Sequence, residues 1–150
     1  MQTLPPKSIV VLTTYDYGSP VVELIPKNYF QWLENHPALV ESGEANNPDG
    51  DALDNRSEYA LGGDPLLADT GFVPSFGNGA VGLEYRHAQR RGTDDLGYHL
   101  ETSTNLVSGV WTNGYYTATG TNTAFDPEFD EVINLIPTDT DERYIRLIVE

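Results

Sequence analysis

The structural prediction starts from twelve residues, Asn47-Pro-Asp-Gly-Asp-Ala-Leu-Asp-Asn-Arg-Ser-Glu58, in which oxygen-bearing side chains recur at short intervals. These side chains stand at loop positions 1, 3, 5, 8, 9 and 12, close to the pattern of an EF-hand loop. Calcium takes about 6–8 oxygen ligands at about 2.3–2.6 Å, and a loop of this kind wraps one ion. The stretch therefore predicts a structural calcium site.

The predicted calcium ligands are mostly side chains, with one backbone carbonyl among them. The side chains are those of Asn47, Asp49, Asp51, Asn55 and Glu58, and the carbonyl is that of Leu53. Glu58 closes the cage with both oxygens, and Asn55 acts directly or through a water. Two residues depart from the EF-hand pattern, because Asn47 replaces the usual Asp and Ala52 replaces the Gly that makes the sharp turn. The alternative is a solvated acidic turn between two helices.

Length and charge limit the classes of protein to consider. The chain has 150 residues, 23 acidic against 8 basic, and a net charge of −15, which disfavours nucleic acid and anionic membranes as partners. No apolar run is long enough to span a membrane, and the first residues lack the features of a signal peptide. The chain has no cysteine and therefore no disulfides. An exported module of this kind needs another source of stability, which a structural metal can supply.

The chain is expected to divide into three parts. Residues 1–27 hold two strands, 9–13 and 21–25, or a linker. Residues 28–66 form a helix of roughly ten residues, the calcium loop, and a short second helix over 55–61 that Gly62-Gly63 terminates. In the first helix, Phe30 and Leu33 are expected to share the packed face, with Tyr29 and Trp32 beside them.

Residues 67–150 follow the pattern of short antiparallel strands. The predicted strands are 80–86, 97–103, 110–112, 115–119, 131–136 and 143–149, and Asn78-Gly79 and Asn113-Gly114 predict type I′ turns. The fold class expected is mostly β: an antiparallel β-sandwich with an EF-hand-like helix–calcium loop–helix insertion near the N-terminal third.

Four blocks, in this order, resemble a known kind of protein region. They are Asn47 to Asn55, Glu58-Tyr-Ala-Leu-Gly-Gly-Asp-Pro65, Leu100 to Leu106 followed by Trp111, and Arg143-Tyr-Ile-Arg-Leu147. The chain resembles, over roughly residues 28–150, the C-terminal accessory region of large secreted proteins from planctomycete and verrucomicrobial bacteria. The first block is also similar to a thrombospondin type 3-like calcium repeat. The resemblance implies export, a calcium role and a covalent neighbour such as a sulfatase or glycoside hydrolase domain.

The second half of the chain also carries arginines and aromatic residues that could bind a ligand. Tyr115 and Tyr116, helped by Arg90 or Arg91, form a candidate carbohydrate-binding surface, since aromatic rings stack on sugars and guanidinium pairs with oxyanions. The alternative is that these arginines neutralise nearby acids and the tyrosines pack in the sheet. Trp111 is expected in the core.

No catalytic motif is present, and the carboxylates include no pair that stands out as an acid and base. Together with the calcium loop and with the export and accessory role that the resemblance implies, this predicts a non-catalytic, calcium-stabilised extracellular or cell-surface accessory module that binds polysaccharide or positions an enzyme. The alternative is a structural spacer, anchoring or assembly subunit with calcium as its sole ligand.

Overall fold

The computed structural model describes residues 25–80 and 82–150. The predicted strand at 9–13 lies outside these residues, as does all of 21–25 except its last residue. The described part contains two helices, α1 (Tyr29–Glu34) and α2 (Asn55–Leu61). Its strands are β1 (Ser75–Asn78), β2 (Leu83–Arg90), β3 (Tyr98–Ser103), β4 (Thr117–Asn122), β5 (Phe129–Ile136) and β6 (Tyr144–Val149). The prediction of a mostly β protein is confirmed.

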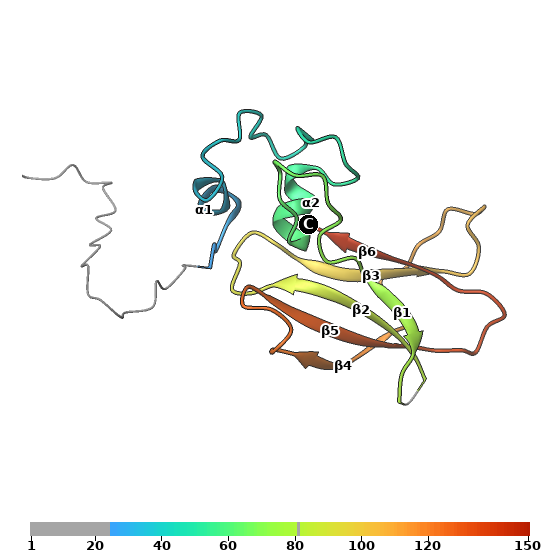
Figure 1. Ribbon diagram of the computed structural model, residues 1–150. Helices are drawn as coiled ribbons and strands as arrows, with labels where there is room; N and C mark the ends of the chain where they lie inside the picture. Colours follow the sequence, from blue (N-terminus) through green and yellow to red (C-terminus); the bar gives the residue numbers. More distant parts are fainter. Residues whose placement is uncertain (1–24, 81) are drawn as a thin grey trace, which may run out of the picture.

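The strands form two antiparallel sheets (Figure 1). The larger sheet has the order β1-β2-β5-β4, and the smaller one pairs β3 with β6. Ser103 at the end of β3 pairs with Tyr144 at the start of β6, so the loops that follow β3 and precede β6 leave the small sheet at the same end. In Figure 1 these loops project on the right, whereas the helices lie at the upper left.

Tyr98 joins the two sheets and the helices. Its ring stacks on the buried ring of His87 in β2, with 6.3 Å between the centroids. Its hydroxyl donates to the carbonyl of Ala60 in α2 at 2.7 Å and accepts the N–H of Arg90 at 3.2 Å. Burial lowers the pKa of His87 to about 4, so this imidazole is neutral at pH 7 and packs as an aromatic ring.

The first helix is shorter than predicted and buries a different face. Asn28 caps it by accepting the N–H of Gln31 at 3.0 Å, and the helix ends after Glu34. Tyr29 and Trp32 are buried, but Phe30 is 76% exposed, which corrects its expected place in the packed face. The physical reason is the helical period, which puts positions three apart on one side and turns the next residue about 100° away.

The second helix matches its predicted bounds. Asp54 caps its start by accepting the N–H of Ser57 at 2.8 Å, and Gly62 ends it with a left-handed φ of 78°. Residues 35–46 separate α1 from the acidic loop, so the predicted helix–loop–helix of EF-hand type is not confirmed. The helices instead meet through a small aromatic core of Tyr29, Trp32, Leu39 and Tyr59.

The β region departs from the prediction at its turns. Strand β1 was not predicted, and the predicted strand 110–112 is a single bridge between Thr102 and Thr112. The type I′ turns are wrong, because neither Asn78 nor Asn113 has the positive φ that such turns require. Tyr115, the first residue of the predicted strand 115–119, has a left-handed φ of 61° and lies before β4, which begins at Thr117.

Candidate metal centre

Three carboxylates converge where the loop meets α2. Asp49, Asp51 and Glu58 each offer an oxygen within 4.8 Å of the others. Glu58 is fixed by the first turn of α2, and the two aspartates come from the loop before it. Oxygen ligands at this separation suit a hard divalent cation, because one ion can contact all three.

Glu58 is the member of this triad that most needs a positive partner. Its side chain is 1% exposed, and neither of its carboxylate oxygens has a hydrogen-bond partner among the described residues. Oδ2 of Asp49 is buried and unpartnered in the same way. Burial, followed by the charges of Asp49, Asp51, Asp69 and Asp64, raises the pKa of Glu58 to about 8. Buried carboxylates are normally paired or bound to metal, so the arrangement is chemically incomplete without a cation or a proton.

Hydrogen bonds within the loop orient its acidic side chains. Oδ1 of Asn47 accepts the N–H of Gly50 at 2.8 Å, and its Nδ2 donates to the carbonyl of Asp51 at 2.8 Å. Oδ1 of Asp51 accepts the N–H of Leu53 at 2.6 Å, while Oδ1 of Asp49 accepts the N–H of Asp51 at 3.3 Å. Each side chain thereby holds the backbone that follows it, and the second oxygen of Asp49 is left for another partner.

The loop turns at a different residue from an EF-hand loop. Within residues 47–58, all of which are described, Gly50 alone has a positive φ, of 76°. The sharp turn thus falls at position 4 rather than position 6, where Ala52 stands. Ala52 is tolerated because its backbone avoids the left-handed region that penalises a Cβ.

The predicted ligands outside the carboxylate triad, Asn47, Leu53 and Asn55, stay predictions. Asn55 is 0% exposed, and its amide nitrogen donates to the carbonyls of Glu41 and Gly43 at 2.7 and 2.9 Å. These bonds tie the segment before the loop to α2, and Oδ1 of Asn55 is buried with no hydrogen-bond partner among the residues that the structure describes. Leu53 donates its N–H to Asp51, which places its backbone beside the acidic cluster.

Asp69 is a neighbour of the centre that the sequence prediction missed. Its N–H donates to Oδ2 of Asp51 at 2.9 Å. A Cβ added to Gly63 would lie 3.1 Å from Oδ1 of Asp69 and 3.2 Å from Oε1 of Glu58, so both side chains lie against the same glycine. No spacing rule links Asp69 to the loop, and the chain reaches it after the turn that follows α2.

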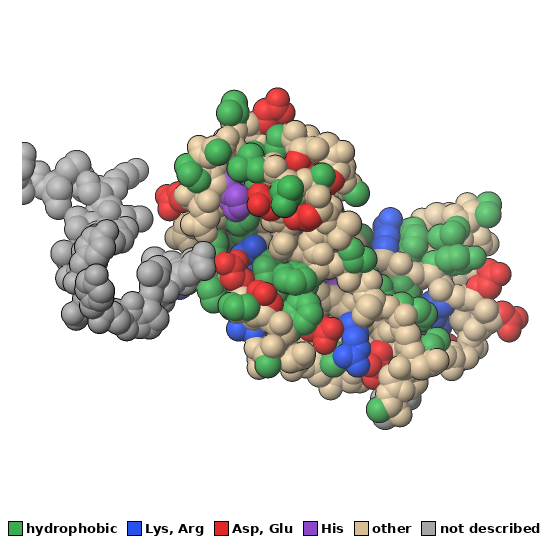
Figure 2. All heavy atoms as spheres, in the orientation of Figure 1, with side chains coloured by type: hydrophobic (Ala, Val, Ile, Leu, Met, Phe, Trp, Pro, Cys, Tyr) green, Lys and Arg blue, Asp and Glu red, His purple; other side chains and the backbone are tan. Residues whose placement is uncertain are grey.

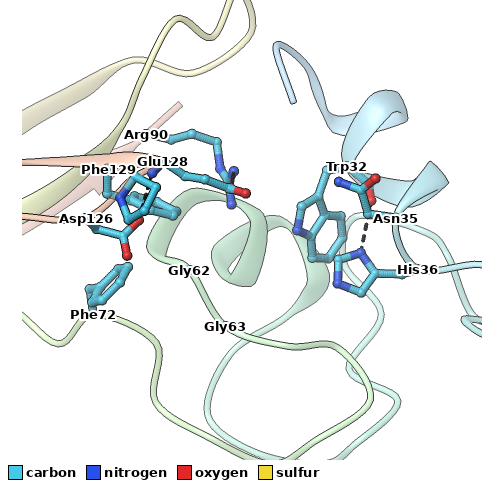
Figure 3. A pocket seen from close by; sticks show the side chains of 11 residues that line it. Trp32, Asn35, His36, Gly62, Gly63, Phe72, Arg90, Asp126, Glu128 and Phe129 are labelled. Atoms are coloured by element: carbon cyan, nitrogen blue, oxygen red, sulfur yellow. Dashed lines mark hydrogen bonds and ion pairs between the residues drawn. The ribbon is translucent and has the colours of Figure 1, made fainter. Parts of the chain in front are cut away.

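The predicted glycan residue Arg90 lies in the junction between the helices and the larger sheet, which corrects its expected exposure. Its guanidinium donates from Nε to the carbonyl of Tyr59 at 2.6 Å, pairs with Glu128, and lies 4.3 Å from the ring centroid of Phe129. Figure 3 shows this junction, with Arg90, Glu128 and Phe129 on one side of a hollow and Trp32 on the other. At 4% exposure Arg90 is unavailable to a sugar.

The other candidate glycan residues divide by exposure. Arg91 pairs with Asp130 of β5 at 2.6 Å and donates to the carbonyl of Pro127, so its guanidinium is engaged within the protein. Tyr115 is 63% exposed. Tyr116 is half-buried, and its hydroxyl donates to Asn113 at 3.0 Å. Trp111, expected in the core, is half-buried beneath the guanidinium of Arg146.

Comparison with known proteins adds no assignment to this geometry. The chain matches no protein-family model, no curated protein and no solved structure. None of the helices in residues 25–80 and 82–150 has the length and apolar character needed to cross a membrane.

Proposed function

We propose that this chain is a non-catalytic accessory module whose fold is completed by one calcium ion. The observation that carries the proposal is Glu58, a carboxylate that is 1% exposed and lies next to Asp49 and Asp51. Its oxygens have no hydrogen-bond partner within residues 25–80 and 82–150. Calcium would take its oxygens from this triad, with Asn47, Asn55 and the Leu53 carbonyl as further ligands.

The position of the triad explains why a cation would act on the fold rather than on a substrate. Glu58 precedes Tyr59, which is 0% exposed in the aromatic core and whose carbonyl accepts the Nε of Arg90. Occupancy of the metal site is thereby linked through one residue to β2. An ion so placed stabilises the folded state by RT ln(1 + [L]/Kd), where L is free calcium.

The job of such a module is to bind a polysaccharide or to position a covalently attached enzyme at the cell surface or in the medium. Extracellular modules need a calcium Kd of only about 10⁻⁴–10⁻³ M. The second candidate is a spacer or assembly subunit with calcium as its sole ligand. It is favoured by the engagement of Arg90 and Arg91 with acids of the protein itself.

Calorimetric melting in calcium and in chelator tests the cation proposal. We expect a higher Tm in calcium, and we expect Glu58→Gln to remove most of that difference because it removes the charge that the ion neutralises. Glu34→Gln is the matched control, since Glu34 is an exposed acid of α1 and should leave the difference unchanged. Equal melting of the parent in calcium and chelator would contradict the proposal.

A further inference from the structure

A polar cavity of about 320 Å³ lies at one end of the small sheet. Its walls are the end of β3, the loop of residues 104–116 and the loop of residues 137–143. Two backbone hydrogen bonds between Thr102 and Thr112, of 2.9 and 3.0 Å, hold the first loop against β3. The start of β3 lies at the helices, where Asp95 accepts hydrogen bonds from Tyr29 and Tyr59, so the cavity is a full strand length from the metal centre.

Arg143 forms a charged wall of this cavity and lacks a full set of partners. Its side chain is 8% exposed and its Nη2 donates to Asp139 at 2.8 Å. Its Nε is buried with no hydrogen-bond partner among the described residues. A buried guanidinium proton without an acceptor is costly. The wall therefore has unused hydrogen-bonding capacity for an additional oxygen.

Tyr115 stands at the cavity and presents an aromatic ring. The guanidinium carbon of Arg143 lies 5.2 Å from its ring centroid, which fixes the ring by a cation–π contact. Its φ of 61° is a left-handed conformation that a bulky residue adopts at a cost, and such conformations cluster at binding sites. With 63% of its surface exposed, the ring offers a face for stacking.

Hydroxyl groups line the rest of the cavity and are arranged to accept hydrogen bonds. Those of Ser103 and Ser108 donate to the carbonyl of Asn105 at 3.0 and 2.9 Å, and that of Thr140 donates to the carbonyl of Glu142 at 3.0 Å. Their protons are committed to the backbone, and the oxygens of Ser103 and Ser108 also accept the N–H of Asn105 at 3.1 Å and of Val110 at 3.4 Å. A hydroxyl oxygen has two lone pairs, so each of these oxygens keeps one for a donor on a ligand. A ligand for this cavity therefore carries hydroxyl donors, an acceptor for Arg143 and an apolar face for Tyr115.

We propose that this cavity binds a neutral pyranose unit of a polysaccharide, with Tyr115 as the stacking platform. The proposal rests on the glycan-binding form of the accessory role and not on the cation. A neutral sugar is favoured over an acidic one because Asp139 already pairs with Arg143 and the chain carries a net charge of −15. Figure 2 shows acidic side chains, in red, spread widely over the visible face. The cavity's volume is at the lower end of the range for small-ligand sites, which suits one ring.

The test is an amide NMR titration of the calcium-loaded full chain with methyl β-glucoside, methyl β-galactoside, methyl α-mannoside and glucuronate. We expect at least one neutral glycoside to shift the amides of residues 102–115 and 139–143, with a Kd on the order of millimolar for a single ring. Tyr115→Asn should weaken binding about tenfold, because Asn adopts the left-handed conformation readily but lacks the ring. Tyr115→Phe should keep it. Phe30→Ala is the matched control, as it removes an aromatic side chain 76% exposed on α1.

Three results would overturn the proposal: no shift at these residues with any neutral glycoside, a response to glucuronate alone, or unchanged affinity in Tyr115→Asn. The same titration in chelator separates it from the cation proposal. If the protein binds no sugar but its Tm still depends on calcium, the pocket proposal is wrong and the cation proposal stands. If the protein binds sugar but its Tm does not depend on calcium, the cation proposal is wrong and the pocket proposal stands.

Discussion

At the scale of single residues, the buried carboxylate of Glu58 is the group on which the proposed cation site depends. It is a buried acid at the edge of the aromatic core and is surrounded by other acids. In the part of the chain that the structure describes, neither of its oxygens accepts a hydrogen bond. Gly50 serves the same centre through its backbone, because its positive φ turns the loop where residues with a Cβ would be strained. The two residues together account for a loop that resembles a calcium loop in composition yet turns at its own position.

The stabilisation by calcium should depend on pH through Glu58. Burial and the neighbouring acids raise the pKa of this carboxyl from 4.5 to about 8 in the metal-free fold. Between these values the folded chain binds a proton that the unfolded chain has released, so the stability that this group contributes is lost as pH rises toward 8. The proposed calcium ion would bind the ionised form and would reverse that loss.

We therefore expect the Tm difference between calcium and chelator to be larger at pH 8 than at pH 5. Calorimetry at both pH values measures it, and Glu58→Gln should flatten the dependence. A Tm difference that is equal at the two pH values would show that Glu58 is not the group whose proton calcium displaces.

At the scale of elements, Arg90 joins the helices to the larger sheet. It extends from the last position of β2, reaches the backbone of α2 through Tyr59, and pairs with Glu128 just before β5. Its guanidinium also lies over the rings of Tyr59 and Phe129, at 5.0 and 4.3 Å. The junction is therefore charged but closely packed. Removing the Arg90 guanidinium would leave the Tyr59 carbonyl and the Glu128 carboxylate without their donor.

Arg90→Met should destabilise the protein by about 3 kcal/mol, because it leaves Glu128 and the Tyr59 carbonyl without their donor. Arg146→Met is the matched control. Arg146 also pairs with an acid, Glu101 at 2.6 Å, but its side chain is 48% exposed, so the expected loss is about 1 kcal/mol or less. Chemical denaturation measures both variants, and equal losses would contradict the role of Arg90 as the junction.

At the scale of the whole molecule, one line of contacts runs from the acidic loop to the sheets. Glu58 and Tyr59 are adjacent in α2, Tyr59 contacts Arg90, and Tyr98 joins both sheets to Ala60. The cavity beside Tyr115 lies beyond this line, at the other end of β3. The cation is therefore expected to stabilise the helices and β2 together while leaving the cavity loops unaffected.

Amide hydrogen exchange in calcium and in chelator should show this division. We expect slower exchange in calcium for α2 and β2 and equal exchange for residues 104–116, since local opening free energies follow the contacts that each segment makes. Slower exchange confined to residues 47–58 would mean that the loop opens independently of the sheet. The contacts through Tyr59 and Arg90 would then not transmit the stabilisation by the cation to β2.

The sequence by itself determined the features that depend on local physics. The pattern of short strands predicted most of the strands, Gly62-Gly63 predicted the end of α2, and the spacing of Asp49, Asp51 and Glu58 predicted that these carboxylates lie close together. Each of these signals acts over a few residues, where backbone geometry fixes which side chains are neighbours.

The tertiary structure alone decided which side chains are buried and which groups from distant segments meet. Phe30 is exposed and Arg90 buried against their simplest expectations, and Asp69 joins the acidic centre only after the chain has passed through α2. The cavity likewise exists because Ser103 and Tyr144 pair across β3 and β6, which brings two loops to one end of the sheet. Burial and long-range pairing depend on how the elements pack. Packing contacts join residues that are far apart in the sequence, so a pattern over a few residues does not predict them.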